Sequence, residues 1–351
     1  MLHRNDDNGS RLAVRATKIS SVILAVSAIL LIAVSGAPFS NVRSDQDLVK
    51  LRNALHYETT DPAVVFQWGP ESMPADFLRE EQPAPPLFHQ VLSQLPGDLG
   101  ASEFERAVQM AIHLVKAPNR SGQAIQSSIA RTYEEIVEEG EGYCADYTLV
   151  LNGLALSDDI PIREWGMSFD GFGGDGHAFS EIYDRALEKW IFLDSFYSFY
   201  VRGPSGEPLS VMEFRRYLLN GDIDSLDVVP IKADRFMFPS FEYALNYYRR
   251  GANFFFMVWG NNVFTYEDHP AVRILSRISR SAEQAAGILF GVQPRIMILR
   301  TPENQDAIDE LSKLRIYLRI AIVCAVVAVA SALVLLATWI CVRRRDTRAA
   351  R

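Results

Sequence analysis

GEGYCADY (residues 140–147), followed by TLVLNGLAL (148–156), is the stretch that decides the fold of this chain. Apolar side chains occupy almost every position of 145–156, which predicts a helix buried on all sides. That helix would begin at Cys144. Unpaired backbone N–H groups and the positive end of the helix dipole would then face the sulfur, and both favour a thiolate nucleophile.

Cys144 has no disulfide partner in its own part of the chain. The sequence holds three cysteines, and Cys324 and Cys341 both lie in an apolar run near the C-terminus. Structural cysteines of an oxidising compartment normally occur in pairs. A single cysteine is therefore either a small buried apolar residue or a working thiol.

Two long runs without charged residues, 19–42 and 320–342, are each about long enough to cross ~30 Å of hydrocarbon. Basic residues precede the first run and follow the second, which places both termini in the cytoplasm. We expect a cytoplasmic tail (1–18), a transmembrane anchor (19–42), a transmembrane helix (316–342) and a basic cytoplasmic tail (343–351). The alternative for the first run is a cleaved signal peptide, because small residues follow its most apolar stretch.

The segment between the two runs then lies outside the cytoplasm. The chain has 43 acidic and 35 basic residues, and the basic ones are concentrated at both ends. The intervening segment is therefore markedly acidic, which argues against nucleic acid as a partner. We divide this segment into an extracytoplasmic arm (43–100), a core (101–203) and an accessory region (204–315).

Helix signals come first in the core and strand signals follow. Ser102 and Glu105 form a capping-box pattern ahead of a helix that stops before Pro118. A second helix is expected from about 122 to a cap at Gly140. Alternating apolar residues then predict strands at 160–169, 177–184 and 189–197. Helices followed by strands indicate an α+β domain.

The accessory region is less clearly patterned. Residues 211–219 and 271–289 predict helices, and 303–315 predicts a helix that runs into the membrane span. FFFMVW (254–259) is interpreted as a buried strand, with a loop that dips into lipid as the alternative.

A thiolate needs a base, and the base needs a group that orients it. His177 opens one predicted strand and Asp194 closes the next. If these strands pair as a hairpin centred between Arg185 and Ala186, His177 lies directly opposite Asp194. Cβ atoms of opposed residues are about 4.5 to 5.5 Å apart, so the carboxylate would reach the imidazole.

Four motifs, GYCADY, DIPIREWGMSF, GHAFSEIY and KWIFLDSF, occur in an order and spacing that resemble the transglutaminase-like superfamily. The resemblance covers about 104–200 and implies a papain-like mechanism without a metal or organic cofactor. It implies Cys144 as nucleophile, His177 as general base and acid, and Asp194 as the residue that orients His177. One departure is that Ser195 and Phe196 follow the aspartate, where relatives often have Pro-Thr.

The resemblance further implies a thioester acyl-enzyme formed on a glutamine or peptide amide. The backbone N–H of Cys144 would be one oxyanion donor, with Tyr143 and Trp165 as side-chain candidates. We therefore expect a membrane-anchored periplasmic enzyme of the bacterial inner membrane that hydrolyses or transfers acyl groups of a cell-envelope peptide or protein. The alternative is a non-catalytic module of the same fold, which binds a peptide or glycan or scaffolds a membrane complex.

Overall fold

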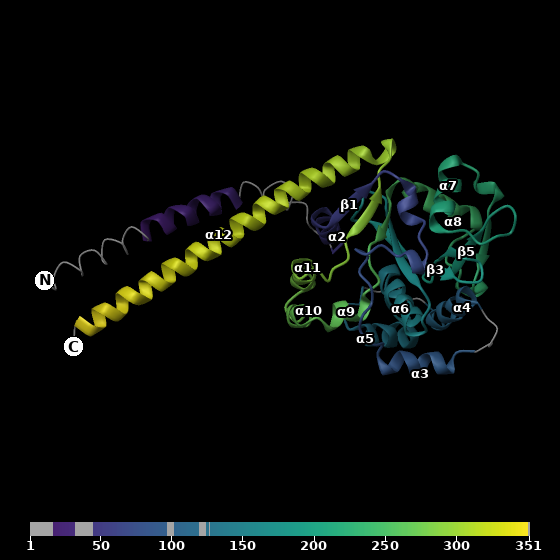
Figure 1. Ribbon diagram of the computed structural model, residues 1–351, viewed down its shortest axis with the longest axis horizontal. Coiled ribbons are helices and arrows are strands. Elements are labelled where there is room, and N and C mark those ends of the chain that lie inside the picture. The colour runs from purple at the N-terminus through teal and green to yellow at the C-terminus, as the bar shows by residue number, and fades with distance from the viewer. Residues whose placement is uncertain (1–16, 32–44, 97–101, 119–123, 126, 350–351) are drawn as a thin grey trace. The chain divides into compact units, whose positions relative to one another are not determined.

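The computed structural model describes residues 17–31, 45–96, 102–118, 124–125 and 127–349 (Figure 1). The chain divides into two units, Leu48–Ile308 and a unit formed by Met1–Asp47 with Asp309–Arg351. The sheets and all predicted site residues belong to Leu48–Ile308. This unit is α+β, as predicted.

A six-stranded mixed sheet forms the centre of this unit. The strands in spatial order are β1 (Tyr57–Thr60), β8 (Ile296–Leu299), β7 (Phe255–Val258), β2 (Ile162–Ser168), β3 (Gly176–Asp184) and β4 (Lys189–Leu193). β1 and β8 are parallel, and the other neighbours are antiparallel. The predicted arm, core and accessory region therefore all contribute strands to one sheet, and FFFMVW supplies the buried strand β7, as predicted.

Successive side chains of a strand point to opposite faces of the sheet, and each face of this sheet packs in its own hydrophobic cluster. Trp165, Phe179 and Phe192 belong to one cluster, whereas Ile162 and Ile182 belong to the other. α7 (Val211–Asn220) and α8 (Phe241–Gly251) cover the first face. The second face is covered by α3 (Pro86–Gln94), α4 (Glu103–Leu114), α5 (Ile129–Glu134) and α6 (Cys144–Ser157) (Figure 1). The sheet is thus the middle of three layers.

The remaining elements complete the unit. They are α2 (Asp45–Leu55), α9 (Val263–Asp268), α10 (Pro270–Leu275), α11 (Arg280–Leu289) and a second, two-stranded sheet of β5 (Phe199–Arg202) and β6 (Asp227–Pro230). The predicted helix at 271–289 is two helices, α10 and α11. They are separate because the Ser279 side chain accepts the N–H of Ala282 and so caps a new helix.

Helix starts follow the capping residues. The predicted capping box is confirmed, since Ser102 accepts the N–H of Glu105 and the Glu105 carboxylate accepts the N–H of Ser102. We predicted that the second helix begins at about residue 122. This prediction is wrong, because the described residues 124–125 and 127–128 are not helical. α5 begins at Ile129 because the Ser128 side chain caps it by accepting the N–H of Arg131.

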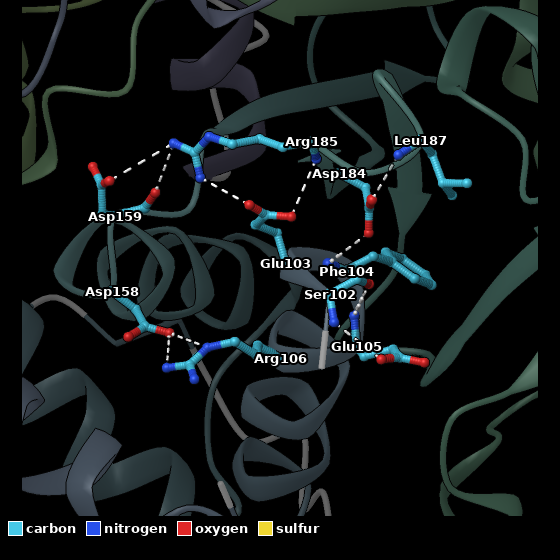
Figure 2. Close-up of polar contacts among 10 residues, drawn as sticks. All are labelled: Ser102, Glu103, Phe104, Glu105, Arg106, Asp158, Asp159, Asp184, Arg185 and Leu187. Carbon is cyan, nitrogen blue, oxygen red and sulfur yellow. Dashed lines mark hydrogen bonds and ion pairs between the residues drawn. The ribbon is translucent and has the colours of Figure 1, made fainter. Parts of the chain in front are cut away.

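The start of α4 is tied to the hairpin that joins β3 and β4, as Figure 2 shows. Asp184, the last residue of β3, accepts N–H groups of Phe104 at 3.3 Å and Leu187 at 3.0 Å. Arg185 in the turn forms an ion pair with Glu103 at 3.0 Å. These contacts fix the hairpin turn against the layer of helices and so set the register of its strands.

Within the described residues, one helix is long and apolar enough to cross a membrane. It is α12 (Gln305–Ala349), which contains the predicted span 316–342 and continues the predicted helix at 303–315 without a break. The structure therefore offers one such helix where we predicted two. Thr17–Leu31, which include the start of the first predicted span, form a shorter apolar helix, and 32–42 lie outside the described residues.

Candidate active site

Two glycines with left-handed backbone lead the chain into α6. Gly140 has φ 70° and ends the π-helical turn Glu135–Glu139, and Gly142 has φ 102°. A Cβ atom on Gly140 would lie 2.0 Å from the carbonyl oxygen of Pro118. Only glycine tolerates both this conformation and this close approach. The turn leaves Tyr143 extended at the N-cap, so that Cys144 is the first residue of the helix, as predicted.

Asp146 holds this turn together. Its carboxylate accepts the N–H of Tyr143 at 2.8 Å and the N–H of Ile125 at 3.2 Å. Burial raises the pKa of Asp146, and the two backbone hydrogen bonds oppose that shift. Asp146 therefore orders the segment around the nucleophile candidate from a buried position at the first turn of α6.

The structure brings the three predicted site residues together. Nε2 of His177 lies 2.6 Å from Oδ2 of Asp194, and both side chains are buried. Cys144 is half-buried, and its sulfur lies close enough to His177 to help raise the pKa of the imidazole. Since Nε2 is occupied by Asp194, Nδ1 is the ring nitrogen left for the thiol. The order Cys, His, Asp is the relay that nucleophilic thiol catalysis needs.

Asp194 is held by two further donors. Oδ1 accepts the backbone N–H of Tyr197 at 2.8 Å, and Oδ2 accepts the hydroxyl of Tyr248 on α8. The backbone of Asp194 also bonds in both directions with Phe199, which closes a tight turn over 195–198. A buried carboxylate with three donors stays in one orientation.

The charges around His177 favour its protonated form. Burial alone would lower the pKa of His177, but the negative charges of Asp194 and Cys144, together with their hydrogen bonds, raise it to about 10. At neutral pH His177 is therefore expected to be an imidazolium. Such a histidine is a ready proton donor to a leaving group.

The predicted hairpin register is wrong by two residues. Tyr183 pairs with Trp190 and Asp184 with Lys189, so the turn is 185–188 and each residue of β3 faces a partner two positions later than we assumed. A shift of two residues keeps every side chain on its face. The predicted strand 189–197 also ends early, at Leu193, because Asp194 begins the turn. His177 reaches Asp194 diagonally, past the last paired residues of the two strands.

Three tyrosines that the sequence analysis did not single out, Tyr197, Tyr247 and Tyr248, surround the imidazole. The ring of Tyr197 lies 4.6 Å from that of His177, and its hydroxyl donates to Tyr247 at 3.3 Å. Burial raises the pKa of Tyr197 to about 12, although its hydrogen bond with Tyr247 works against the shift. The phenols of Tyr197 and Tyr247 both interact electrostatically with Cys144.

The two predicted side-chain donors to an oxyanion, Trp165 and Tyr143, differ in burial. Trp165 was a wrong choice, because it is buried and its Nε1 donates to Glu181 at 2.6 Å. Tyr143 is 44% exposed at the N-cap. The backbone N–H of Cys144 lies in the first turn of α6, where helices have no internal acceptor.

In the described residues no group of three or more His, Cys, Asp or Glu side chains is arranged to hold a metal ion. Comparison with known protein families, with curated proteins and with solved structures found no match to this chain.

Proposed function

We propose that this protein is a membrane-anchored thiol enzyme of transglutaminase-like type, which acts on an amide of a cell-envelope peptide or protein. The observation that carries the proposal is that Cys144, His177 and Asp194 come together at one site, with a buried His–Asp contact of 2.6 Å. The half-buried sulfur at the start of α6 remains within reach of a substrate. Nucleophile, proton carrier and orienting group are thus present in one place.

The chemistry proceeds in two steps. The Cys144 thiolate attacks the amide carbon, the C–N bond breaks, and His177 gives its proton to the leaving amine, which yields a thioester. Water or an amine then attacks the thioester and loses a proton to His177, and the thiolate is released. Asp194 keeps the same ring nitrogen bonded throughout, so Nδ1 faces the reaction. Hydrolysis and transfer differ only in the acceptor.

Negative charge develops on the carbonyl oxygen in both steps. The N–H of Cys144 at the helix start is the candidate for one donor, and the hydroxyl of Tyr247, which packs against His177, is the candidate for a second. α12 is the candidate anchor, and we propose with it a catalytic unit that lies outside the cytoplasm. No metal or organic cofactor takes part in this scheme.

The test is the rate at which iodoacetamide labels Cys144, measured from pH 5.5 to 9. Cys324→Ala and Cys341→Ala make Cys144 the only thiol in the chain. We expect fast labelling at pH 6.5 that falls at least tenfold in His177→Ala, because an ordinary thiol is only about 1% ionised there. The exposed His89 on α3 provides the matched control, since His89→Ala should label like the parent.

Slow labelling at pH 6.5 in the parent, unchanged in His177→Ala, would reject the enzyme. The same fold would then serve as a binding or scaffolding module. A parent that labels rapidly justifies a search for amide substrates, beginning with release of ammonia from glutamine-containing peptides.

A further inference from the structure

A cavity of about 200 Å³ lies on the α6 side of the sheet. Its walls come from α2, α6, β2, β7, α9 and α11, and charged or polar side chains predominate among them, including Arg52, Asn152, Glu164, Tyr266 and Arg280. Pockets for drug-sized ligands are about 300 to 1,000 Å³ and mostly apolar. A cavity this small and this polar suits a single charged group of amino-acid size.

Glu164 is the negative group of this cavity. Glu164 lies on β2, inside the sheet, and is half-buried. The exposed part of its side chain lines the cavity. Its carboxylate makes no hydrogen bond to any residue in the described part of the chain. Burial raises the pKa of Glu164 to about 7, although the positive charge of Arg52 opposes the shift. A carboxylate in such a place normally has a partner.

Arg52 and Arg280 are the positive groups. Arg52 donates from Nε and Nη2 to Oδ1 of Asn53, at 3.2 and 3.1 Å, and forms no ion pair with a described residue. Its charge and that of Glu164 influence each other, yet the two side chains do not bond. Arg280 contacts Glu283 through Nη1 alone, at 2.9 Å, which leaves Nε and Nη2 for another acceptor.

We propose that this cavity binds a free α-amino-acid group, with its ammonium on Glu164 and its carboxylate on Arg52 and Arg280. A zwitterion satisfies the Glu164 carboxylate together with the half-buried Arg52 and the partly exposed Arg280. A simple anion would leave Glu164 without a partner, and a simple amine would leave Arg52 without an ion-pair partner. Guanidinium groups suit a planar carboxylate especially well.

The cavity lies next to the candidate active site. Ala145 and Asp146, which line it, directly follow Cys144. A substrate that ends in this group would extend toward the sulfur. That link to substrate choice rests on the proposed function, whereas the binding does not.

The test uses the full chain with Cys144→Ala in detergent micelles, so that binding is measured without turnover. Three probes are compared by titration calorimetry: L-glutamine, N-acetyl-L-glutamine without the ammonium, and L-glutaminamide without the carboxylate. We expect L-glutamine to bind at least tenfold more tightly than either derivative. Glu164→Gln should remove the preference over the acetylated probe, and Arg52→Gln should remove the preference over the amide.

Glu242→Gln and Arg249→Gln, both on exposed positions of α8, are matched controls and should keep both preferences. Equal binding of the three probes, absence of L-glutamine binding, or unchanged preferences in both cavity variants would overturn the proposal. L-glutamine binding together with slow, His177-independent labelling of Cys144 would reject the proposed enzyme and leave the binding site intact.

The pH dependence gives a second readout if a cavity variant does not fold. The titratable and charged groups facing Glu164 are Arg52 and His56 from α2 and the loop after it, Asp146 from α6, Tyr266 from α9 and Arg280 from α11. With the pKa of Glu164 at about 7, its ionised fraction rises from about 0.1 at pH 6 to about 0.9 at pH 8. L-glutamine affinity should therefore rise roughly tenfold, and N-acetyl-L-glutamine affinity should not. A flat profile for L-glutamine would overturn the proposal.

Discussion

Removal of the Tyr248 hydroxyl should destabilise the protein only by the loss of its hydrogen bond to Asp194. Tyr248 is fully buried, and its ring packs edge-on against Phe179 and Phe192, contacts that Tyr248→Phe preserves. The substitution removes one of three donors to the Asp194 carboxylate. A hydrogen bond to a buried charged group contributes about 1.5 to 3 kcal/mol, so we expect a loss of that size in the free energy of unfolding.

Thermal unfolding of the full chain in detergent micelles measures this loss. Four of the five tryptophans, Trp68, Trp165, Trp190 and Trp259, lie in the unit Leu48–Ile308 and report on it. For a unit of this size about 1 kcal/mol corresponds to roughly 2 to 4 °C, so Tm should fall by about 3 to 12 °C. Tyr243→Phe on the same helix is the control, because Tyr243 is 55% exposed.

The control should stay within about 0.5 kcal/mol of the parent. If Tyr248→Phe and Tyr243→Phe unfold at the same temperature, Tyr248 is not a donor to Asp194 and the proposed orientation of His177 loses one of its supports. Labelling of Cys144 gives a second readout, with a rate in Tyr248→Phe between those of the parent and His177→Ala.

Three further results are expected. Glu181→Gln should cost about 3 to 5 kcal/mol of unfolding free energy in denaturant titrations, since it breaks a buried ion pair with Arg163 whose atoms lie 2.6 Å apart; a loss below about 1 kcal/mol would contradict this. Gly140→Ala should lower Tm much more than Gly221→Ala. Both glycines have left-handed backbone, but only at Gly140 would the added Cβ atom collide with the backbone of Pro118. Equal decreases in Tm would count against the close approach of Gly140 to Pro118. The stabilisation that His177 provides relative to His177→Ala should be complete below about pH 6.5 and decline as pH rises toward 10, since its pKa is raised on folding; a difference that grows with pH would have the wrong sign.

Local patterns in the sequence predicted the parts of the site that depend on neighbouring residues. The start of α6 at Cys144 follows from the glycines and the apolar run, and the start of α4 follows from Ser102 and Glu105. The strands that carry His177 and Asp194 follow from alternation. Each of these signals is complete within about ten residues, so no information about distant contacts is needed.

The rest depended on contacts between distant segments. The hairpin register was wrong because Asp184 and Arg185 bind the start of α4, which lies some 80 residues earlier. Tyr248 reaches Asp194 from 54 positions away, and a tyrosine in an aromatic-rich stretch gives no local sign of that role. The four-residue strand β1, YETT, has too little pattern to reveal its partner β8. The membership of these strands in one sheet appears only in the folded chain.

The pairing of β1 with β8 has a consequence for the order of folding. These strands are neighbours in the sheet, yet Tyr57 pairs with Ile296, roughly 240 residues further along the chain. At about 5 to 20 residues per second, synthesis leaves β1 without its neighbour for roughly ten to fifty seconds. During that interval β7 also has an open edge, because β8 lies between it and β1. A chain halted before residue 296 would retain Cys144, His177 and Asp194 but would expose that edge to pairing with other chains.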